Sequence, residues 1–287
     1  MRFAHVVPDG VDEPQLVLVE KDRAALVSQL FDGAPSRLQP LIEGGDALLD
    51  RVRESAATAE WMPLGDPVFA SAVLDTPITI AIGLNYSAHS SELGLKADAA
   101  PTVFILWPGS LSGHRQTTTW PRSLSQSVDY EAELGVIIGA PARDVALEDA
   151  LDHVWGYTVV NDITARDIQF SEAQWSRCKS FDGFTPTGPF VVTADEIPDP
   201  QDLHIWAIVD GKMVQDASTD QMIHPVAKLV AFLSQSATLL PGTLISTGSP
   251  GGAGYSRDPQ IFLRDRSTVT VGVDGIGELT TFCRITD

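Results

Sequence analysis

Short apolar runs, often β-branched and bounded by turn residues, dominate the hydrophobic pattern of the chain, and such runs are typical of β-strands. We expect strands at Arg2–Val7, Gln15–Glu20, Pro77–Gly83, Thr102–Trp107, Val128–Ile138, Val154–Asp162, Phe190–Thr193 and Leu203–Val209. Two Asp-Gly pairs, Asp210-Gly211 and Asp274-Gly275, lie between apolar runs. Because Asp-Gly accepts the positive φ angles of a type I′ turn, both pairs predict hairpins.

Helical periodicity is restricted to a few segments. The clearest is Pro225–Leu240, in which one face carries Val226, Leu229, Val230, Leu233 and Ala237. We also expect helices over Arg23–Phe31 and Leu38–Ala57. Strands and helices do not alternate regularly, which disfavours a doubly wound sheet or an eight-fold barrel and favours a strand-rich, mixed α+β fold.

A stretch rich in proline and glycine, Trp61–Val68, separates two parts of the chain. We therefore predict a small N-terminal α/β domain over residues 1–65 and a larger, strand-rich domain over residues 66–287.

The composition is that of a globular protein, with 287 residues, 44% hydrophobic and 20% charged. The net charge of −19 repels nucleic-acid backbones and anionic lipid surfaces, so we expect neither nucleic acid nor membrane as a partner. An anionic substrate would have to be attracted by local positive charge, from basic side chains or a metal ion.

Cysteine usage and the lack of an export or membrane segment indicate where the protein is found. Cys178 and Cys283 are the only cysteines and form no CxxC motif, so neither a disulfide framework nor a zinc site is expected. The opening MRFAHVVPDG lacks the apolar stretch of a signal peptide, and no uniform apolar run approaches the ~18 residues of a spanning helix. We expect a cytoplasmic protein.

Glu131 and Glu133 stand two residues apart in a predicted strand, so both side chains project from the same face. The strand then becomes fully apolar and is expected to be buried. Two like charges near a core are costly unless a cation lies between them. The alternative is a solvent-facing edge of the sheet.

Asp162 ends a second apolar strand and could face the glutamate pair. Three carboxylates without histidine or cysteine form a hard oxygen site, which suits Mg²⁺, Mn²⁺ or Ca²⁺. The alternative is that Asp162 or Thr164 caps the short helix that carries Arg166.

Several other polar residues are candidates with ordinary alternatives. Arg166 and Gln169 would share a face if their segment is helical. Lys179 lies among aromatic residues and prolines, although a generic lysine is a surface residue. The amides of the glycine-rich segment Ile245–Gly254 could approach an anion, or the segment could be an ordinary flexible loop.

His89 and Glu92 are three residues apart directly after a predicted strand. In a helical turn they would be neighbours, and a carboxylate beside an imidazole raises its basicity, as a general base acting on water requires. The alternative is solvated charge on a surface helix.

Five segments in this order resemble the fumarylacetoacetate hydrolase family: NYSAHSSE, DYEAELGVIIG, GYTVVNDITARDIQ, CKSFDGFTPTGP and ISTGSPGG. The resemblance covers residues 77–287 and implies a strand-rich mixed fold and a homodimer. It also implies a site for Mg²⁺, or alternatively Mn²⁺ or Ca²⁺, formed by Glu131, Glu133 and Asp162. The catalytic residues it implies are His89, Glu92 and Lys179, and the substrate-binding residues are Tyr86, Arg166, Gln169 and Thr247.

The activity implied by this resemblance is hydrolysis of a C–C bond in an acylpyruvate-like, 2-oxo or 1,3-diketo acid through a metal-stabilised enolate. His89 and Glu92 would activate water, and Lys179 would stabilise negative charge or return a proton. Decarboxylation of an oxaloacetate-type acid, hydration and isomerisation use the same scaffold, and a catalytically inactive member is a further alternative.

Trp107 stands where many members carry a basic residue, and Ala88 where a common version has Asp. Trp107 predicts a preference for apolar acyl groups.

Overall fold

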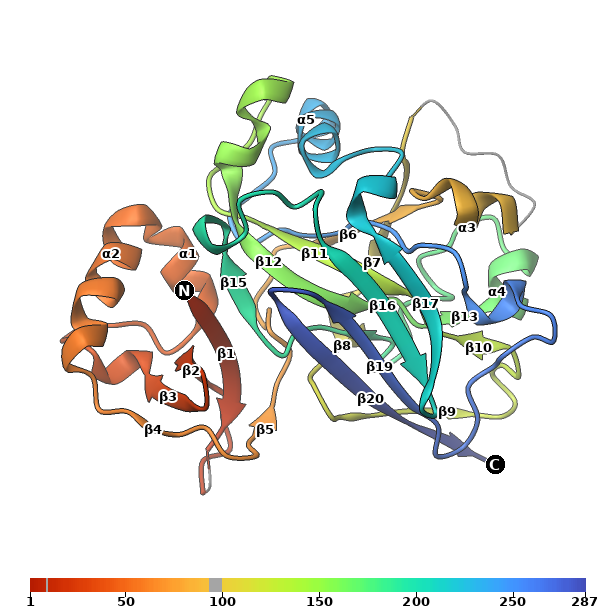
Figure 1. Ribbon diagram of the computed structural model, residues 1–287, viewed down its shortest axis with the longest axis horizontal. Coiled ribbons are helices and arrows are strands. Elements are labelled where there is room, and N and C mark those ends of the chain that lie inside the picture. The colour runs from red at the N-terminus through yellow and green to blue at the C-terminus, as the bar shows by residue number, and fades with distance from the viewer. Residues whose placement is uncertain (9, 93–99) are drawn as a thin grey trace.

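The computed structural model (Figure 1) describes residues 1–8, 10–92 and 100–287, and of residues 89–91 only the backbone. The strands are β1 Arg2–Val7, β2 Gln15–Glu20, β3 Arg23–Leu26, β4 Met62–Pro63, β5 Val68–Phe69, β6 Thr79–Gly83, β7 Thr102–Leu106, β8 Leu111–Ser112, β9 Thr117–Pro121, β10 Val128–Asp129, β11 Ala132–Ile138, β12 Val154–Asn161, β13 Thr164–Ala165, β14 Thr185–Pro186, β15 Val191–Thr193, β16 His204–Val209, β17 Lys212–Ser218, β18 Leu244–Ser246, β19 Thr268–Val273 and β20 Gly277–Thr286. The α-helices are α1 Leu38–Glu43, α2 Gly45–Ser55, α3 Ser87–Glu92, α4 Arg166–Ser171 and α5 Val226–Ser236.

Two mixed sheets form the body of the protein. Within the described residues, the larger sheet has eleven strands in the order β4-β3-β2-β1-β15-β12-β11-β18-β6-β7, with β5 paired to β1. The smaller sheet has the order β17-β16-β19-β20-β9. It packs against β11 and β12 of the larger sheet, as Figure 1 shows. Mixed sheets with few helices confirm the expected α+β class.

β11 and β12 are buried along their whole length because both of their faces are covered. Leu134, Val136 and Ile138 belong to the same apolar cluster as Ile205 and Val271 of the smaller sheet. Since side chains alternate along a strand, Glu133 must project from the opposite face. The Glu133 carboxylate is therefore directed away from the interface between the two sheets.

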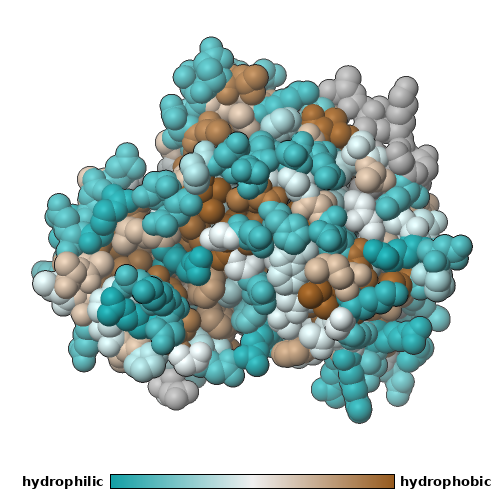
Figure 2. All heavy atoms as spheres, viewed as in Figure 1, coloured by the Kyte–Doolittle hydropathy of each residue, from teal (hydrophilic) through white to brown (hydrophobic). Residues whose placement is uncertain are grey.

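The N-terminal part continues the larger sheet. β1 pairs with β15, with Arg2 opposite Val192 and Phe3 opposite Val191. Helices α1 and α2 contribute Leu38, Leu41, Ile42 and Val52 to a core cluster that also contains Phe3 of β1 and Trp155 of β12. Figure 2 shows hydrophilic residues over most of one face of the molecule, with apolar residues along the junction between the N-terminal part and the main body.

Three sequence predictions need correction. The helix expected over Arg23–Phe31 is wrong, because this segment forms β3 and a 3₁₀ turn at Val27–Gln29. Pairing of β3 with β2 through backbone hydrogen bonds outweighs the local helical tendency. The helix expected over Leu38–Ala57 is broken into α1 and α2 at Gly44–Gly45, where Gly45 has a φ of 62°.

The third correction concerns the acidic strand, which ends at Asp129 and resumes at Ala132, so that Glu131 precedes β11.

Both predicted hairpins are present. Asp210 and Gly211 have the positive φ angles of a type I′ turn, whereas the loop at Asp274 has three residues and a positive φ at Gly275 only. The helix predicted over Pro225–Leu240 is present as the shorter α5, Val226–Ser236, which buries Val226, Leu229, Val230 and Leu233, whereas Ala237 follows the helix and is exposed.

No helix in the described part of the chain is long and apolar enough to cross a membrane.

Candidate metal and substrate site

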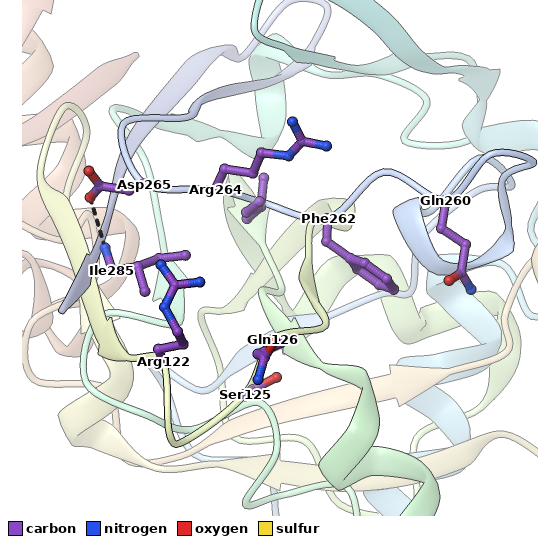
Figure 3. Close-up of a pocket in the computed structure, with 9 residues that line it drawn as sticks. Arg122, Ser125, Gln126, Gln260, Phe262, Arg264, Asp265 and Ile285 are labelled. Carbon is purple, nitrogen blue, oxygen red and sulfur yellow. Dashed lines mark hydrogen bonds between the residues drawn. The ribbon is translucent and has the colours of Figure 1, made fainter. Parts of the chain in front are cut away.

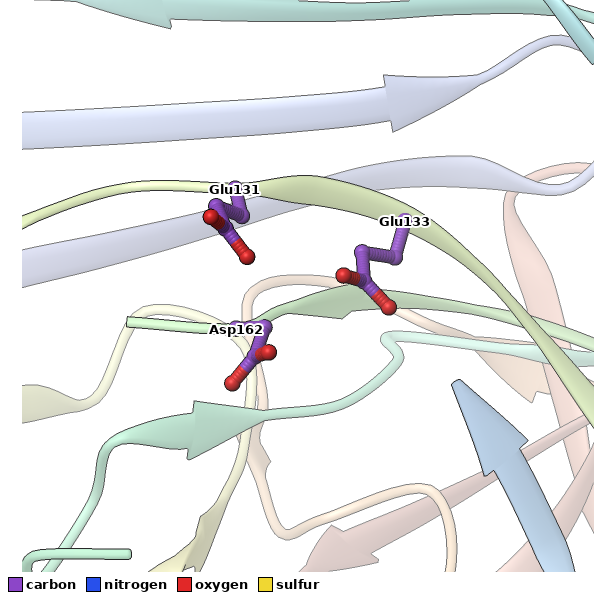
Figure 4. Close-up of side chains that lie close together, drawn as sticks. All are labelled: Glu131, Glu133 and Asp162. Atoms are coloured by element: carbon purple, nitrogen blue, oxygen red, sulfur yellow. The ribbon is translucent and has the colours of Figure 1, made fainter. Parts of the chain in front are cut away.

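Glu131, Glu133 and Asp162 lie together on one face of the larger sheet (Figure 4). Register places them there, because Ala132 at the start of β11 pairs with Asn161 at the end of β12. The residues flanking this pair therefore face one another, and the amide of Asp162 donates to the carbonyl of Glu131 at 2.9 Å. One carboxylate oxygen from each of the three residues lies within 4.8 Å of the other two.

All three carboxylates are buried, with at most 3% of each residue exposed. Burial of such groups is costly unless each charge is compensated. Lys179 supplies part of the compensation, since its Nζ donates to Glu131 Oε2 at 2.7 Å and also to Asp162 Oδ2. Glu133 accepts hydrogen bonds from the Ser246 hydroxyl and, at 2.9 Å, from the Gly248 amide.

Arg166 is fully buried beside the three carboxylates and is held on three sides. Its Nε donates to Asp129 Oδ1 at 2.7 Å, its Nη1 to Gln169 Oε1 at 2.9 Å, and its Nη2 to Glu131 Oε1 at 2.6 Å. The helical turn of α4 brings Arg166 and Gln169 onto one face, as the spacing predicted. In this arrangement Arg166 orients the Glu131 carboxylate.

The fixed charges of this assembly leave a negative excess. Four buried carboxylates, at Asp129, Glu131, Glu133 and Asp162, surround two buried cations, at Arg166 and Lys179. With all groups ionised, two negative charges remain, which is the charge that a divalent cation neutralises. Asp162 Oδ1 is also buried without a hydrogen-bond partner in the described part of the protein. The residues therefore fit a divalent ion with oxygen ligands.

The pKa values follow from burial and from these neighbours. Burial raises the pKa of Glu133 well above its ordinary value, and the charges of Asp162 and Glu131 raise it further. Burial also raises the pKa of Asp162, while Lys179 acts in the opposite direction. Burial lowers the pKa of Lys179, but attraction to Asp162 and Glu131 outweighs this effect and the pKa rises, so the ammonium group stays charged at neutral pH.

A small cavity of about 10 Å³ opens onto these side chains, and Glu131, Glu133, Gln169, Lys179 and Trp175 are among its lining residues. This volume is close to that needed for one water molecule or ion. A larger organic substrate requires the neighbouring side chains to move.

Glu92 connects α3 to the glycine-rich loop, residues 248–257. Its carboxylate accepts hydrogen bonds from the Gly252 amide at 2.9 Å and from the Ser256 hydroxyl at 2.9 Å. Gly252 has a φ of 98°, and a Cβ atom there would lie 2.3 Å from the Val214 carbonyl oxygen. The backbone of His89 lies in α3, but its side chain is outside the described part of the structure.

Comparison with known proteins decides the family. Residues 79–284 match the family model described as "Fumarylacetoacetate (FAA) hydrolase C-terminal". The chain belongs to the fumarylacetoacetate hydrolase family. The fumarylacetoacetate hydrolase of Exiguobacterium antarcticum has a solved structure that is 31% identical, with a TM-score of 0.87 and 99% of each chain covered.

Two further structures of similar proteins differ in their named activity. A maleylpyruvate hydrolase from a Sphingobium species, in complex with manganese(II) and pyruvate, is 27% identical, with a TM-score of 0.84 and 100% of each chain covered. A 5-carboxymethyl-2-hydroxymuconate delta-isomerase from Mycobacterium smegmatis is 30% identical, with a TM-score of 0.78 and 100% of each chain covered. The chain's family is thus known from the family model, but similar proteins carry out different reactions. The reaction that this protein catalyses is therefore a proposal.

Two residues that the family resemblance implies for substrate binding lie deep in the protein. The Thr247 hydroxyl donates to the Leu134 carbonyl at 2.8 Å. Tyr86 is 1% exposed and belongs to the largest apolar cluster, and burial raises the pKa of its hydroxyl. Their contact with substrate stays a prediction.

Trp107 directly follows β7 and lies next to the segment that carries Lys179. Its amide donates to the Ser180 hydroxyl at 3.0 Å, and 48% of the residue is exposed. The side chain is thus available for contact with a ligand or a second molecule.

Sequence reasoning did not identify Asp129 as part of the site. This residue is fully buried and accepts from both Arg166 and the Tyr255 amide. The available signal was its position two residues before Glu131, on the same face as the glutamate pair if the strand were continuous.

A separate and larger cavity of about 460 Å³, shown in Figure 3, lies outside this cluster. Its lining includes Arg122, Gln126, Gln260 and Arg264, and none of the predicted site residues. This cavity is therefore distinct from the candidate metal site.

Proposed function

We propose that the protein is a divalent-metal-dependent hydrolase that cleaves a C–C bond in an acylpyruvate-like or 1,3-diketo acid. The observation that carries this proposal is the convergence of three buried carboxylates within 4.8 Å in a member of this family. The unpartnered Oδ1 of Asp162 and the excess of two negative charges, with all groups ionised, support a divalent ion as the partner of these carboxylates.

Glu131, Glu133 and Asp162 would hold the ion, and we propose Mg²⁺ because the ligands are all hard oxygens, with Mn²⁺ or Ca²⁺ as alternatives. When bound, such an ion supplies Lewis-acid polarisation of a substrate carbonyl. The related maleylpyruvate hydrolase holds manganese(II) together with pyruvate, which supports a 2-oxo acid as the substrate class.

The protein side chains would perform the proton transfers and the charge stabilisation. Lys179 keeps an ammonium group beside Glu131 and Asp162, where it can stabilise developing enolate charge or return a proton to the leaving carbon. We propose that His89, with Glu92 in the same helix, takes a proton from the attacking water. Arg166 and Gln169 would hold a carboxylate or keto oxygen once the substrate displaces part of their mutual hydrogen bonding.

Isomerisation is a second candidate, because one similar structure is a delta-isomerase. Isomerisation and decarboxylation share the enolate with hydrolysis but do not require attack by water. Assays of acetylpyruvate and oxaloacetate side by side with Mg²⁺ separate hydrolysis from decarboxylation. We expect pyruvate and acetate from acetylpyruvate, whereas turnover of oxaloacetate alone would reject hydrolysis.

We also propose a homodimer. β7 is one edge strand of the larger sheet; within it Val103 and Ile105 are 42% and 44% exposed, and Trp107 directly after it is 48% exposed. An edge strand with a row of exposed apolar side chains is unfavourable in an isolated monomer. The mass measured by light scattering tests this, and a Val103→Lys variant should shift the protein toward monomer.

A further inference from the structure

A chain of buried contacts links the glycine-rich loop to a candidate metal ligand. The Tyr255 amide donates to Asp129 Oδ2 at 2.8 Å, and Asp129 Oδ1 accepts from Arg166 Nε at 2.7 Å. The same guanidinium donates through Nη2 to Glu131 Oε1 at 2.6 Å. Asp129 therefore contacts both the loop and the group that orients Glu131.

The loop is built to lie against Asp129. A Cβ atom on Gly254 would lie 2.9 Å from the Asp129 Cβ and 1.9 Å from the Ile261 carbonyl oxygen, so the approach requires glycine. The ring of Tyr255 also packs on Phe170 of α4, with 4.8 Å between the ring centroids. Two contacts thus join Tyr255 to the helix and the aspartate that surround Arg166.

The other end of this chain reaches α3. Glu92 accepts from Gly252 and Ser256, which flank Tyr255 in the same loop. These contacts form a continuous path from the loop, through Asp129 and Arg166, to the Glu131 carboxylate.

We propose that Asp129 is a positioning residue that couples docking of the glycine-rich loop to the orientation of Glu131 through Arg166. This inference rests on the proposed divalent-metal site. If residue 129 carried no charge, Glu131 would be the main anionic partner of Arg166. The Arg166 guanidinium would then compete more strongly with the metal ion for the Glu131 carboxylate. Partners that orient metal ligands typically contribute 10–100-fold to metal affinity.

The experiment uses Mn²⁺ alone as the probe, without substrate. Titration calorimetry gives the Mn²⁺ affinity, and hydrogen exchange measures protection of the amides of residues 253–257 with and without Mn²⁺. We expect Mn²⁺ to slow this exchange in the wild type. In Asp129→Asn, we expect Mn²⁺ affinity to fall by 10–100-fold and the protection to be lost even at saturating Mn²⁺.

Two further variants make the result specific. Gly254→Ala acts from the loop side while keeping all the carboxylates, and it should reproduce both effects even if Asp129→Asn does not fold. Asp258→Asn removes one negative charge at an exposed residue directly after the loop. This variant should behave as wild type.

The outcomes separate the two proposals. Absence of Mn²⁺ binding by the wild type would reject the proposed function itself. Wild-type affinity and protection in Asp129→Asn or Gly254→Ala, with Mn²⁺ binding intact in the parent protein, would overturn the coupling alone. Loss of affinity with undiminished protection would also overturn it, because the loop would then respond to the metal by another route, such as Gly248 and Glu133.

Discussion

The Nζ atom of Lys179 lies 2.7 Å from Oε2 of Glu131, inside the protein, where only 2–3% of either residue is exposed. The same ammonium group donates to Asp162. Lys179 thus occupies two of the three carboxylates that would hold a divalent ion, and it competes with that ion for their charge while also supplying a proton donor beside the substrate.

Replacement of Lys179 separates these two roles. In Lys179→Met we expect the Mn²⁺ affinity to be maintained or increased, because a competing cation is lost, whereas kcat should fall at least about 100-fold. The metal-free protein should be destabilised by about 3–5 kcal/mol, since buried carboxylates lose their partner. Calorimetry, steady-state kinetics and denaturant unfolding measure the three quantities, and unchanged kcat would contradict a role for Lys179 in the reaction.

Substitution of His89 tests water activation. In His89→Ala we expect hydrolysis of acetylpyruvate to fall by about 10²–10⁴-fold, the range typical of a lost general base, with Mn²⁺ affinity unchanged. His204→Ala, at an exposed position in β16, serves as the control and should retain activity. Intact hydrolysis in His89→Ala would show that another group activates water.

Trp107 should set the substrate preference. We expect the wild type to favour apolar acyl groups over acyl groups with a terminal carboxylate, and Trp107→Arg should shift the ratio of kcat/KM toward the carboxylate by about 10-fold or more, through a charge-assisted contact. A panel of acylpyruvates differing only in the distal group measures the ratio. Equal rates for both groups in the wild type would contradict this role.

His5 should make stability depend on pH. Its Nε2 accepts from the Leu38 amide at 3.2 Å and its Nδ1 lies 3.1 Å from the Ala72 carbonyl, an arrangement that requires a neutral ring. Burial lowers the pKa of His5 from 6.5 to about 4. The pKa of this histidine is higher in the unfolded chain, so the unfolded chain binds the proton first as pH falls. The contribution of His5 to the free energy of unfolding is fully present above pH ~6.5. About 3 kcal/mol of stability is lost between pH ~6.5 and ~4.

A His5→Gln variant isolates this contribution. Its free energy of unfolding should fall less than that of the wild type between pH 7 and pH 4, by the same 3 kcal/mol or so. Urea unfolding at several pH values measures the difference. Parallel pH profiles for the two proteins would show that His5 does not titrate on unfolding.

The sequence was sufficient for the part of the site that depends on strand geometry. The two-residue spacing predicted that Glu131 and Glu133 lie together, and the acidic end of the next strand indicated Asp162 as their neighbour; the three do converge, although Glu131 precedes β11 instead of lying within it. The helical spacing of Arg166 and Gln169 likewise indicated their contact. These relationships are local or follow from pairing of adjacent strands.

Relationships set by tertiary packing could not be read in the same way. The segment after Arg23 has helical composition but pairs with β2, because a neighbouring strand edge satisfies its backbone groups. Asp129 joins the site through tertiary contacts with Arg166 of α4 and with the loop around Tyr255, more than a hundred residues later. The only local signal was its spacing of two residues from Glu131, and this spacing alone does not separate a buried aspartate from a surface one.

The most direct test of the metal site is binding of Mn²⁺ to the wild type and to Glu131→Ala, each freed of metal with a chelator. We expect one Mn²⁺ per chain in the wild type, with acetylpyruvate hydrolysis restored in proportion to occupancy, and loss of both binding and turnover in Glu131→Ala. Full turnover by chelator-treated wild type, or Mn²⁺ binding of equal affinity in Glu131→Ala, would contradict a metal centre built on these three carboxylates.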